Sequence, residues 1–193
     1  MPSSKILTST FALLVLTTAC GGGATPDASS PASATKTATD TTLPKAPDHP
    51  DSDKVTWKKD GKPCHIKDAG DGDLVASVTK IAKGCVDTTK MHQVGDATQG
   101  QGAETGTMVT PIPFAAKANH CYRVFGLAQS TVTDFDVAVM DSTGKSTGED
   151  LTDSNDAIVL EDGVICFKAD DAVSVNAAVA AGGGKWAVEV WSD

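Results

Sequence analysis

The chain has 193 residues, of which 40% are hydrophobic and 5% aromatic, and its formal net charge is −9. This length suits one domain with attached segments. The charge argues against nucleic acid as a partner, because phosphate binding requires clustered basic side chains and Arg123 is the only arginine. The acidity suits solubility or cation binding.

Residues 1–19 contain the parts of an export signal: one cation, Lys5, then an apolar run at 11–16, then small residues up to Cys20. The apolar run is too short to span a bilayer. The segment 16–20, LTTAC, resembles the lipobox of bacterial lipoproteins, in which a signal peptidase cuts before a diacylated cysteine. The resemblance predicts a lipid on Cys20, although Thr17 stands where an aliphatic residue is usual. The alternative is an ordinary secretory signal with a chance cysteine.

Residues 20–52 are predicted to form a disordered tether. The stretch 21–50 is mainly Gly, Ala, Ser, Thr, Pro and Asp, with Leu43 as its only large apolar residue. Such a segment cannot bury enough surface to offset the entropy lost on ordering. Gly21 is not the aspartate that favours inner-membrane retention of lipoproteins, so we expect an outer-membrane lipoprotein of the cell envelope.

Residues 53–193 are predicted to fold as one domain. The run at 55–57, VTW, is read as a first strand or a packing lid. The segment 74–84 has the period of a short helix, with Asp73 suited to the N-cap and Gly84 to the end. The polar, glycine-rich residues 95–106 are expected to form a loop, and two prolines restrict the strand predicted at 107–114 to a sheet edge.

The rest of the domain contains short β-prone runs separated by Asp, Gly and Ser turns. They lie at 120–129, 133–140, 157–160, 163–168, 172–180 and 184–191. Strands at such intervals, with a glycine turn at 182–184, predict a mainly β fold, an antiparallel β-sandwich, rather than a parallel sheet with crossover helices.

Four phrases of this region carry a resemblance. They are Cys121-Tyr122, the strand and turn 134–144 (DFDVAVMDSTG), Cys166-Phe167 and the terminal 184–190 (GKWAVEV). Over 107–191 the chain resembles the bacterial pre-peptidase C-terminal (PPC) domain, whose members carry a D-x-D-h-x-h-x-D-x-x-G strand and turn. The cysteine pair is similar to lipoproteins of myxobacteria. Trp186 stands where the family usually has Tyr. The resemblance implies a jelly-roll-like sandwich and an accessory role in binding or maturation.

Four cysteines lie beyond the tether: Cys64, Cys85, Cys121 and Cys166. An even set in an exported chain predicts two disulfides. Of the three pairings, we favour Cys64 with Cys85, around the helix, and Cys121 with Cys166, in matched strands. A zinc site is the alternative, because Cys64 precedes a histidine and Cys121 follows one, but neighbouring residues on a strand point to opposite faces.

Acidic residues gather around the turns of the central hairpin. They are Asp134, Asp136, Asp141, Glu149, Asp150, Asp153 and Asp156. Oxygen ligands at a sandwich rim can hold calcium, and Asp134, Asp136 and Asp141 are the candidate ligands. The alternative is turn formation, in which Asp and Ser bond to their own backbone.

No sequence motif for catalysis is present. The sequence therefore predicts a non-enzymatic, monomeric cell-envelope accessory or binding module, attached to the membrane through a lipid anchor and recognising an envelope protein or glycan. The alternative is a small secreted-type enzyme or a calcium-dependent binder of envelope glycans. Exposed aromatic rings around Trp57 and Trp191 would favour glycan binding, whereas buried rings would serve only core packing.

Overall fold

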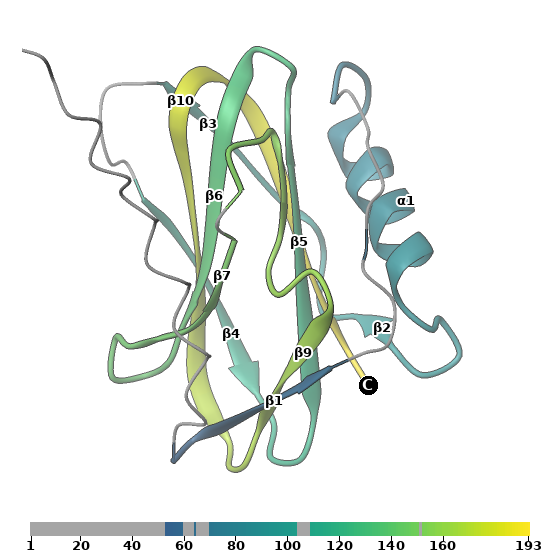
Figure 1. The fold of residues 1–193 in the computed structure, drawn as a ribbon, viewed down its shortest axis with the longest axis vertical. Helices are drawn as coiled ribbons and strands as arrows, with labels where there is room; N and C mark the ends of the chain where they lie inside the picture. Colours follow the sequence, from purple (N-terminus) through teal and green to yellow (C-terminus); the bar gives the residue numbers. More distant parts are fainter. Residues whose placement is uncertain (1–52, 60–63, 65–69, 104–108, 151) are drawn as a thin grey trace, which may run out of the picture. The chain divides into compact units, whose positions relative to one another are not determined.

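The computed structural model describes residues 53–59, 64, 70–103, 109–150 and 152–193 (Figure 1). The fold is mainly β, an antiparallel sandwich-like arrangement with one short helix, which confirms the predicted fold class. The predicted signal peptide, the predicted lipidation site Cys20, the predicted tether and His65 lie outside the described residues.

The strands in chain order are β1 (Val55–Lys59), β2 (His92–Gln93), β3 (Thr98–Ala103), β4 (Thr110–Ala116), β5 (Cys121–Ala128), β6 (Val132–Met140), β7 (Ser146–Glu149), β8 (Asp156–Ile158), β9 (Gly163–Phe167) and β10 (Asp171–Ser192). All of their pairings are antiparallel. Helix α1 spans Leu74–Cys85. Strand β7 was not predicted from the sequence, because its run Ser-Thr-Gly-Glu lacks large apolar residues.

The long strand β10 connects the two halves of the sandwich. Its first part pairs with β4 and β6, and its second part pairs with β5, β3 and β2. The sequence predicted two strands separated by a turn at 182–184, and this prediction is wrong. The register with β6 shifts between Val179 and Gly182, and Gly182 has φ +82°. A bulge therefore bends one continuous strand from one sheet into the other.

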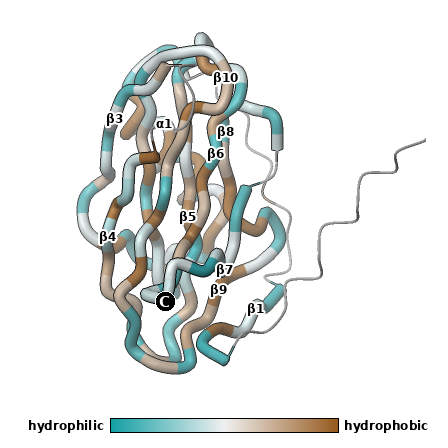
Figure 2. Tube along the Cα trace, turned by 90° about the vertical axis from the view of Figure 1, so that its left-hand side faces the viewer, coloured by the Kyte–Doolittle hydropathy of each residue, from teal (hydrophilic) through white to brown (hydrophobic). Residues whose placement is uncertain are grey.

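The main core lies between the two halves and follows the alternation of β6 and β10. Phe135, Val137 and Val139 of β6 are buried, as are Val173 and Val175 of β10. Brown, apolar segments follow the strands in Figure 2, and most of the turns are hydrophilic. Because side chains alternate along a strand, the intervening residues of β6 and β10 lie on the opposite face of this sheet.

Helix α1 covers part of the other sheet. Asp73 caps it as predicted, since its Oδ1 accepts hydrogen bonds from the backbone N–H groups of Val75 and Ala76 at 3.0 and 3.2 Å. The helix continues through Gly84, the predicted end, to Cys85, and Val86 forms the C-cap. Its apolar face packs on a second core cluster that includes residues of β5, β9 and β10.

Two charged side chains of the sheet are buried, and both have hydrogen-bond partners. Glu189 accepts a hydrogen bond from the indole N–H of Trp191 at 2.9 Å and another from the hydroxyl of Thr79 on α1. Arg123 donates to the carbonyl oxygen of Cys85 at 3.0 Å. The bonds to Thr79 and Cys85 connect the helix to the sheet.

The segment predicted as a loop at 95–106 contains strand β3, so that prediction is wrong at 98–103. Its glycines lowered the β-strand signal, but they are what allows the strand to pair with β10. Gly100 lies opposite Trp186, and Gly102 lies over Val179. The absent side chains leave room for these two large residues. Among the described residues, strand β4 pairs only with β10, which agrees with the edge position predicted from its prolines.

A Gly100→Ala substitution is expected to lower the free energy of unfolding by about 1–3 kcal/mol, the usual cost of overpacking a core. A methyl group there would lie 2.1 Å from Cζ2 of Trp186. Urea unfolding followed by tryptophan fluorescence measures the loss. Gly72→Ala is the matched control, because a Cβ at Gly72 meets no atom within 4 Å. Equal stability of the two variants would contradict the packing of Trp186 against β3.

Candidate functional site

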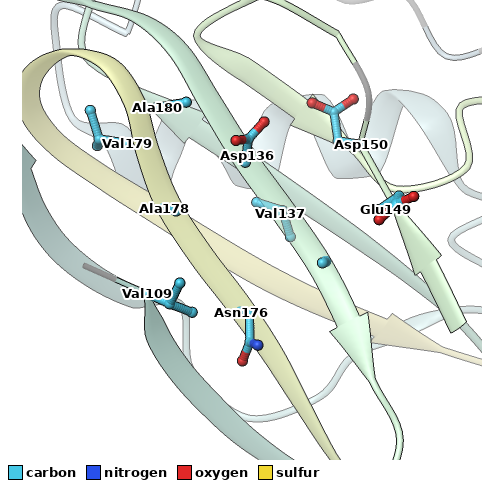
Figure 3. A pocket seen from close by; sticks show the side chains of 10 residues that line it. Val109, Asp136, Val137, Glu149, Asp150, Asn176, Ala178, Val179 and Ala180 are labelled. Atoms are coloured by element: carbon cyan, nitrogen blue, oxygen red, sulfur yellow. The ribbon is translucent and has the colours of Figure 1, made fainter. Parts of the chain in front are cut away.

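A groove of about 560 Å³ lies on the face of β6 and β10 that is turned away from the core (Figure 3). We call it the β6–β10 groove. It is lined by Val109, Asp136, Val137, Ala138, Glu149, Asp150, Asn176, Ala178, Val179 and Ala180. Its volume falls within the range of about 300–1,000 Å³ that is typical of small-molecule sites.

The strand register explains why the sheet is hollowed here. Ala138 of β6 lies between Glu149 of β7 and Asn176 of β10, and the next outward pair is Asp136 with Ala178. Alanines in the middle of this face leave space that larger side chains would fill. Val109, just before β4, is 49% exposed and adds an apolar wall. In Figure 3 it lies on the opposite side of β10 from Glu149 and Asp150.

Three carboxylates line the groove, and they differ in their exposure to solvent. Asp136 and Glu149 are exposed, whereas Asp150, directly after β7, is 6% exposed. Burial raises the pKa of the Asp150 carboxyl to about 7, and the nearby charges of Asp136 and Asp156 add to the rise. The hydroxyl of Thr152 donates to both Asp150 oxygens at 3.0 and 3.1 Å, which opposes this rise only in part.

The pKa of Asp136 is also raised. Partial burial is the main cause, and the charges of Asp134, Asp153 and Glu149 contribute. Among the residues that the structure describes, no lysine, arginine or histidine forms an ion pair with Asp136, Glu149 or Asp150. The groove is therefore a region of negative charge that the described part of the chain leaves uncompensated.

The three carboxylates proposed as calcium ligands do not come together. Asp134 and Asp136 lie on β6 near the groove, but Asp141 follows the far end of the strand, roughly 16 Å from Asp136 at about 3.3 Å per residue. Across the described residues, no group of three or more His, Cys, Asp or Glu side chains is placed to hold a metal ion. The spacing of the residues along a straight strand was enough to reveal this separation.

Asp141 instead forms the turn between β6 and β7. Its Oδ1 accepts hydrogen bonds from the backbone N–H groups of Thr143 and Lys145 at 2.8 and 3.1 Å, and Gly144 supplies φ +78°. Burial tends to raise the pKa of this carboxyl, but the hydrogen bond that the Thr143 hydroxyl donates to it, these backbone bonds and the charge of Lys54 hold it below its usual value. Turn formation, the alternative reading of the acidic residues, therefore accounts for Asp141.

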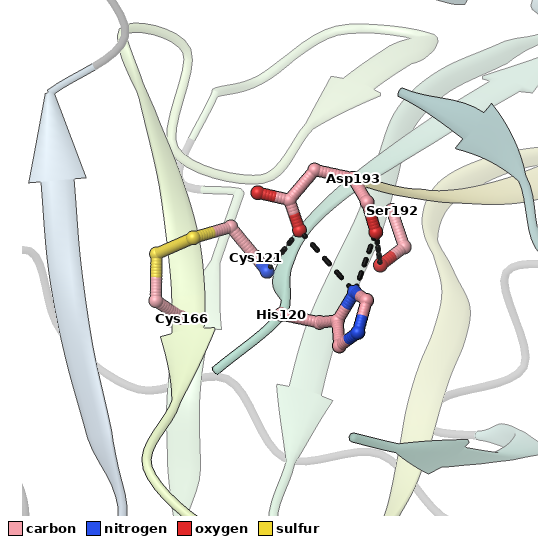
Figure 4. The surroundings of a disulfide bond; sticks show 5 residues. All are labelled: His120, Cys121, Cys166, Ser192 and Asp193. Carbon is pink, nitrogen blue, oxygen red and sulfur yellow. Dashed lines mark hydrogen bonds and ion pairs between the residues drawn. A yellow bond between two sulfur atoms is a disulfide. The ribbon is translucent and has the colours of Figure 1, made fainter. Parts of the chain in front are cut away.

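Both disulfides join the cysteines in the favoured pairs. Cys64 bonds to Cys85 at the end of α1, with a Cα–Cα distance of 5.2 Å. Cys121 and Cys166 lie directly opposite each other on β5 and β9, with a Cα–Cα distance of 3.9 Å (Figure 4). The sulfur atoms that the zinc alternative requires are thus all used in disulfides.

The positions of the tryptophan and histidine side chains are relevant to the two alternatives, glycan binding and an enzyme. Trp186 and Trp191 are buried, and Trp57 is half-buried against the core, so the described tryptophans form no exposed platform for a sugar ring. His120 lies beside Cys121, and its Nδ1 contacts the backbone oxygen of Asp193 (Figure 4). His92 is exposed on β2. In the described ranges, neither histidine is hydrogen-bonded to a Ser, Thr or Cys side chain.

Sequence reasoning identified the acidic residues of the groove but not its floor. Asp136, Glu149 and Asp150 were named in the acidic set, whereas Ala138, Asn176 and Ala178 were not considered. Alternation gives the signal that would have found them: where Phe135, Val137 and Val139 face the core, Ala138 must face outward. The pairing of β6 with β10 could not be read in this way, because 30 or more residues separate the two strands in sequence.

Comparison of the chain with protein-family models gives no match, and comparison with curated proteins gives none either. Helix α1, with 12 residues, is too short to cross a bilayer, and the described part of the chain holds no helix that meets the length and apolarity this requires.

Proposed function

We propose that the protein is a binding module of the bacterial cell envelope, held to the outer membrane by a lipid on Cys20, with the β6–β10 groove as its ligand face. The observation that carries the proposal is the groove itself. It has the volume of a small-molecule site, and all of its lining residues except Val109 and Asp150 stand on strands of the sheet. Such a site holds its shape before a ligand arrives.

Two features support the proposed localisation in the cell envelope. The two disulfides support export, because such bonds form and persist in oxidising compartments outside the cytoplasm. The sequence from Lys5 to Cys20 has the order of parts found in lipoprotein signals.

The resemblance to the pre-peptidase C-terminal domain supports an accessory rather than a catalytic role. The family's aspartate-flanked strand corresponds to β6 and the turn after it, and the family's terminal motif corresponds to the second part of β10. In our proposal these elements form the framework of the groove, and no catalytic step is assigned to the protein.

Lipidation is tested with a Cys20→Ala variant in cells fed labelled palmitate. We expect the label on the protein to fall to background and the protein to leave the membrane fraction, because the variant lacks the acceptor thiol. Thr17→Leu is the matched control, since it restores the aliphatic residue that the lipobox usually has and should keep the label. Equal label in Cys20→Ala and the parent protein would remove the lipid anchor from the proposal.

A further inference from the structure

We propose that the β6–β10 groove binds a linear aliphatic polyamine, whose ammonium groups pair with the exposed carboxylates of Asp136 and Glu149 while its methylene chain lies on Ala138 and Ala178. The inference rests on the proposed function, because it names the ligand class of the same groove. Shape and charge complementarity support it, and each is argued in turn below.

The shape of the groove fits an unbranched chain. Ala138 and Ala178 stand on neighbouring strands, one register step apart, and both present small apolar surfaces on the outward face. Val109 extends this apolar surface on the far side of β10. Methylene groups laid across it would lose contact with water, which favours binding.

The charge of the groove calls for a cation. Asp136, Glu149 and Asp150 have no ion-pair partner within the described ranges, and Asp134, Asp153 and Asp156 are close enough to add to the repulsion. The folded state disfavours the charged forms of Asp136 and Asp150, whose pKa values are raised first by burial and then by the neighbouring carboxylates. Unfavourable charge of this kind concentrates at functional sites. A bound polycation would offset it.

The spacing of the carboxylates selects a ligand with several separated charges. No three acidic side chains of the described structure converge on one point as a metal ion requires. Asp136 comes from β6, whereas Glu149 and Asp150 come from the end of β7, and the apolar floor extends from them towards β10. Ammonium groups separated by short methylene segments match this arrangement. The Asn176 Oδ1, which already accepts a hydrogen bond from the Ser174 hydroxyl at 3.1 Å, has one further lone pair to offer.

An extended peptide is less suitable for this groove. β10 pairs with β4 on one side and with β6 on the other, and β6 pairs with β10 and β7. The backbone groups beneath the groove are therefore engaged in the sheet. A peptide would find only side chains there, without the main-chain ladder that strand addition supplies.

The test is a calorimetric titration of the full chain with spermidine at low ionic strength, together with amide chemical shifts. We expect saturable binding, with shifts centred on Ala138 and Ala178. An Asp136→Asn/Glu149→Gln double variant should bind at least about tenfold more weakly, because hydrogen bonds to charged groups are worth about 1.5–3 kcal/mol each. Asp53→Asn/Asp96→Asn is the matched control, since both residues are exposed, Asp53 before β1 and Asp96 between β2 and β3, and the pair removes the same two charges away from the groove. It should bind as the parent does.

Two results would overturn the inference: equal spermidine affinity in the double variant and the parent, or shifts located away from the groove. Titration with 1,8-octanediol, an uncharged chain, distinguishes the claim that the groove binds a ligand from the claim that this ligand is a polyamine. If octanediol shifts Ala138 and Ala178 and spermidine does not bind, the polyamine inference falls while the groove remains a binding site. If neither probe shifts these residues, the groove function falls as well.

Discussion

A Cys121→Ala/Cys166→Ala double variant is expected to lose about 3–4 kcal/mol of unfolding free energy. The two cysteines are 45 residues apart in sequence, and cross-linking them removes the entropy of a loop of that length from the unfolded chain. They also lie in register where β5 pairs with β9, so the disulfide holds these two strands together. Strand β1 pairs with the other edge of β9. Urea unfolding of oxidised protein gives the two stabilities.

The companion bond supplies the comparison for this prediction. Cys64 and Cys85 close a shorter loop of 21 residues, so their double alanine variant is expected to lose about 3 kcal/mol by the same argument. Reductant should destabilise the parent protein and leave a variant without these four cysteines unchanged. A parent protein whose stability does not change on reduction would contradict the assignment of a stabilising role to these bonds.

The parts of the fold that could be predicted are those determined by residues close together in the sequence. Alternation defined β6, the aspartate before Leu74 defined the start of α1, and matched contexts paired Cys121 with Cys166. The parts that were missed depend on partners distant in sequence. β3 is a strand because Trp186 fills the space over Gly100, and Gly182 is a bulge because β10 continues past it into the second sheet. No local propensity contains that information.

The acidic residues also look alike in the sequence but differ in their three-dimensional environments. The sequence shows Asp136 and Asp141 as members of one set, but the strand between them places the first on the groove and the second in a turn. Burial decides their chemistry further. Asp141 receives backbone hydrogen bonds that favour its charged form, whereas Asp150 is buried beside other carboxylates, which favours its neutral form. These opposite environments give opposite effects of pH on stability.

An Asp150→Asn variant is expected to unfold with a free energy that depends less on pH between 4 and 7 than that of the parent protein, and to be the more stable of the two above pH 7. The folded state raises the pKa of Asp150 from 3.8 to about 7, so it holds a proton that the unfolded chain releases in this range. Stability from this group is complete below about pH 4 and is lost as the pH rises through 7. The rise from 3.8 to about 7 corresponds to a loss of at most about 4 kcal/mol, at about 1.4 kcal/mol per pKa unit, and asparagine, which has nearly the same shape and does not titrate, removes it. Urea unfolding of both proteins at a series of pH values measures the difference.

Asp141→Asn is the control of opposite sign. The folded state lowers the pKa of the Asp141 carboxyl, so the parent protein should gain stability from Asp141 above the unfolded pKa, and the variant should be the less stable one at pH 7. Parallel pH curves for the parent and Asp150→Asn would show that this carboxyl is not buried beside its acidic neighbours as described.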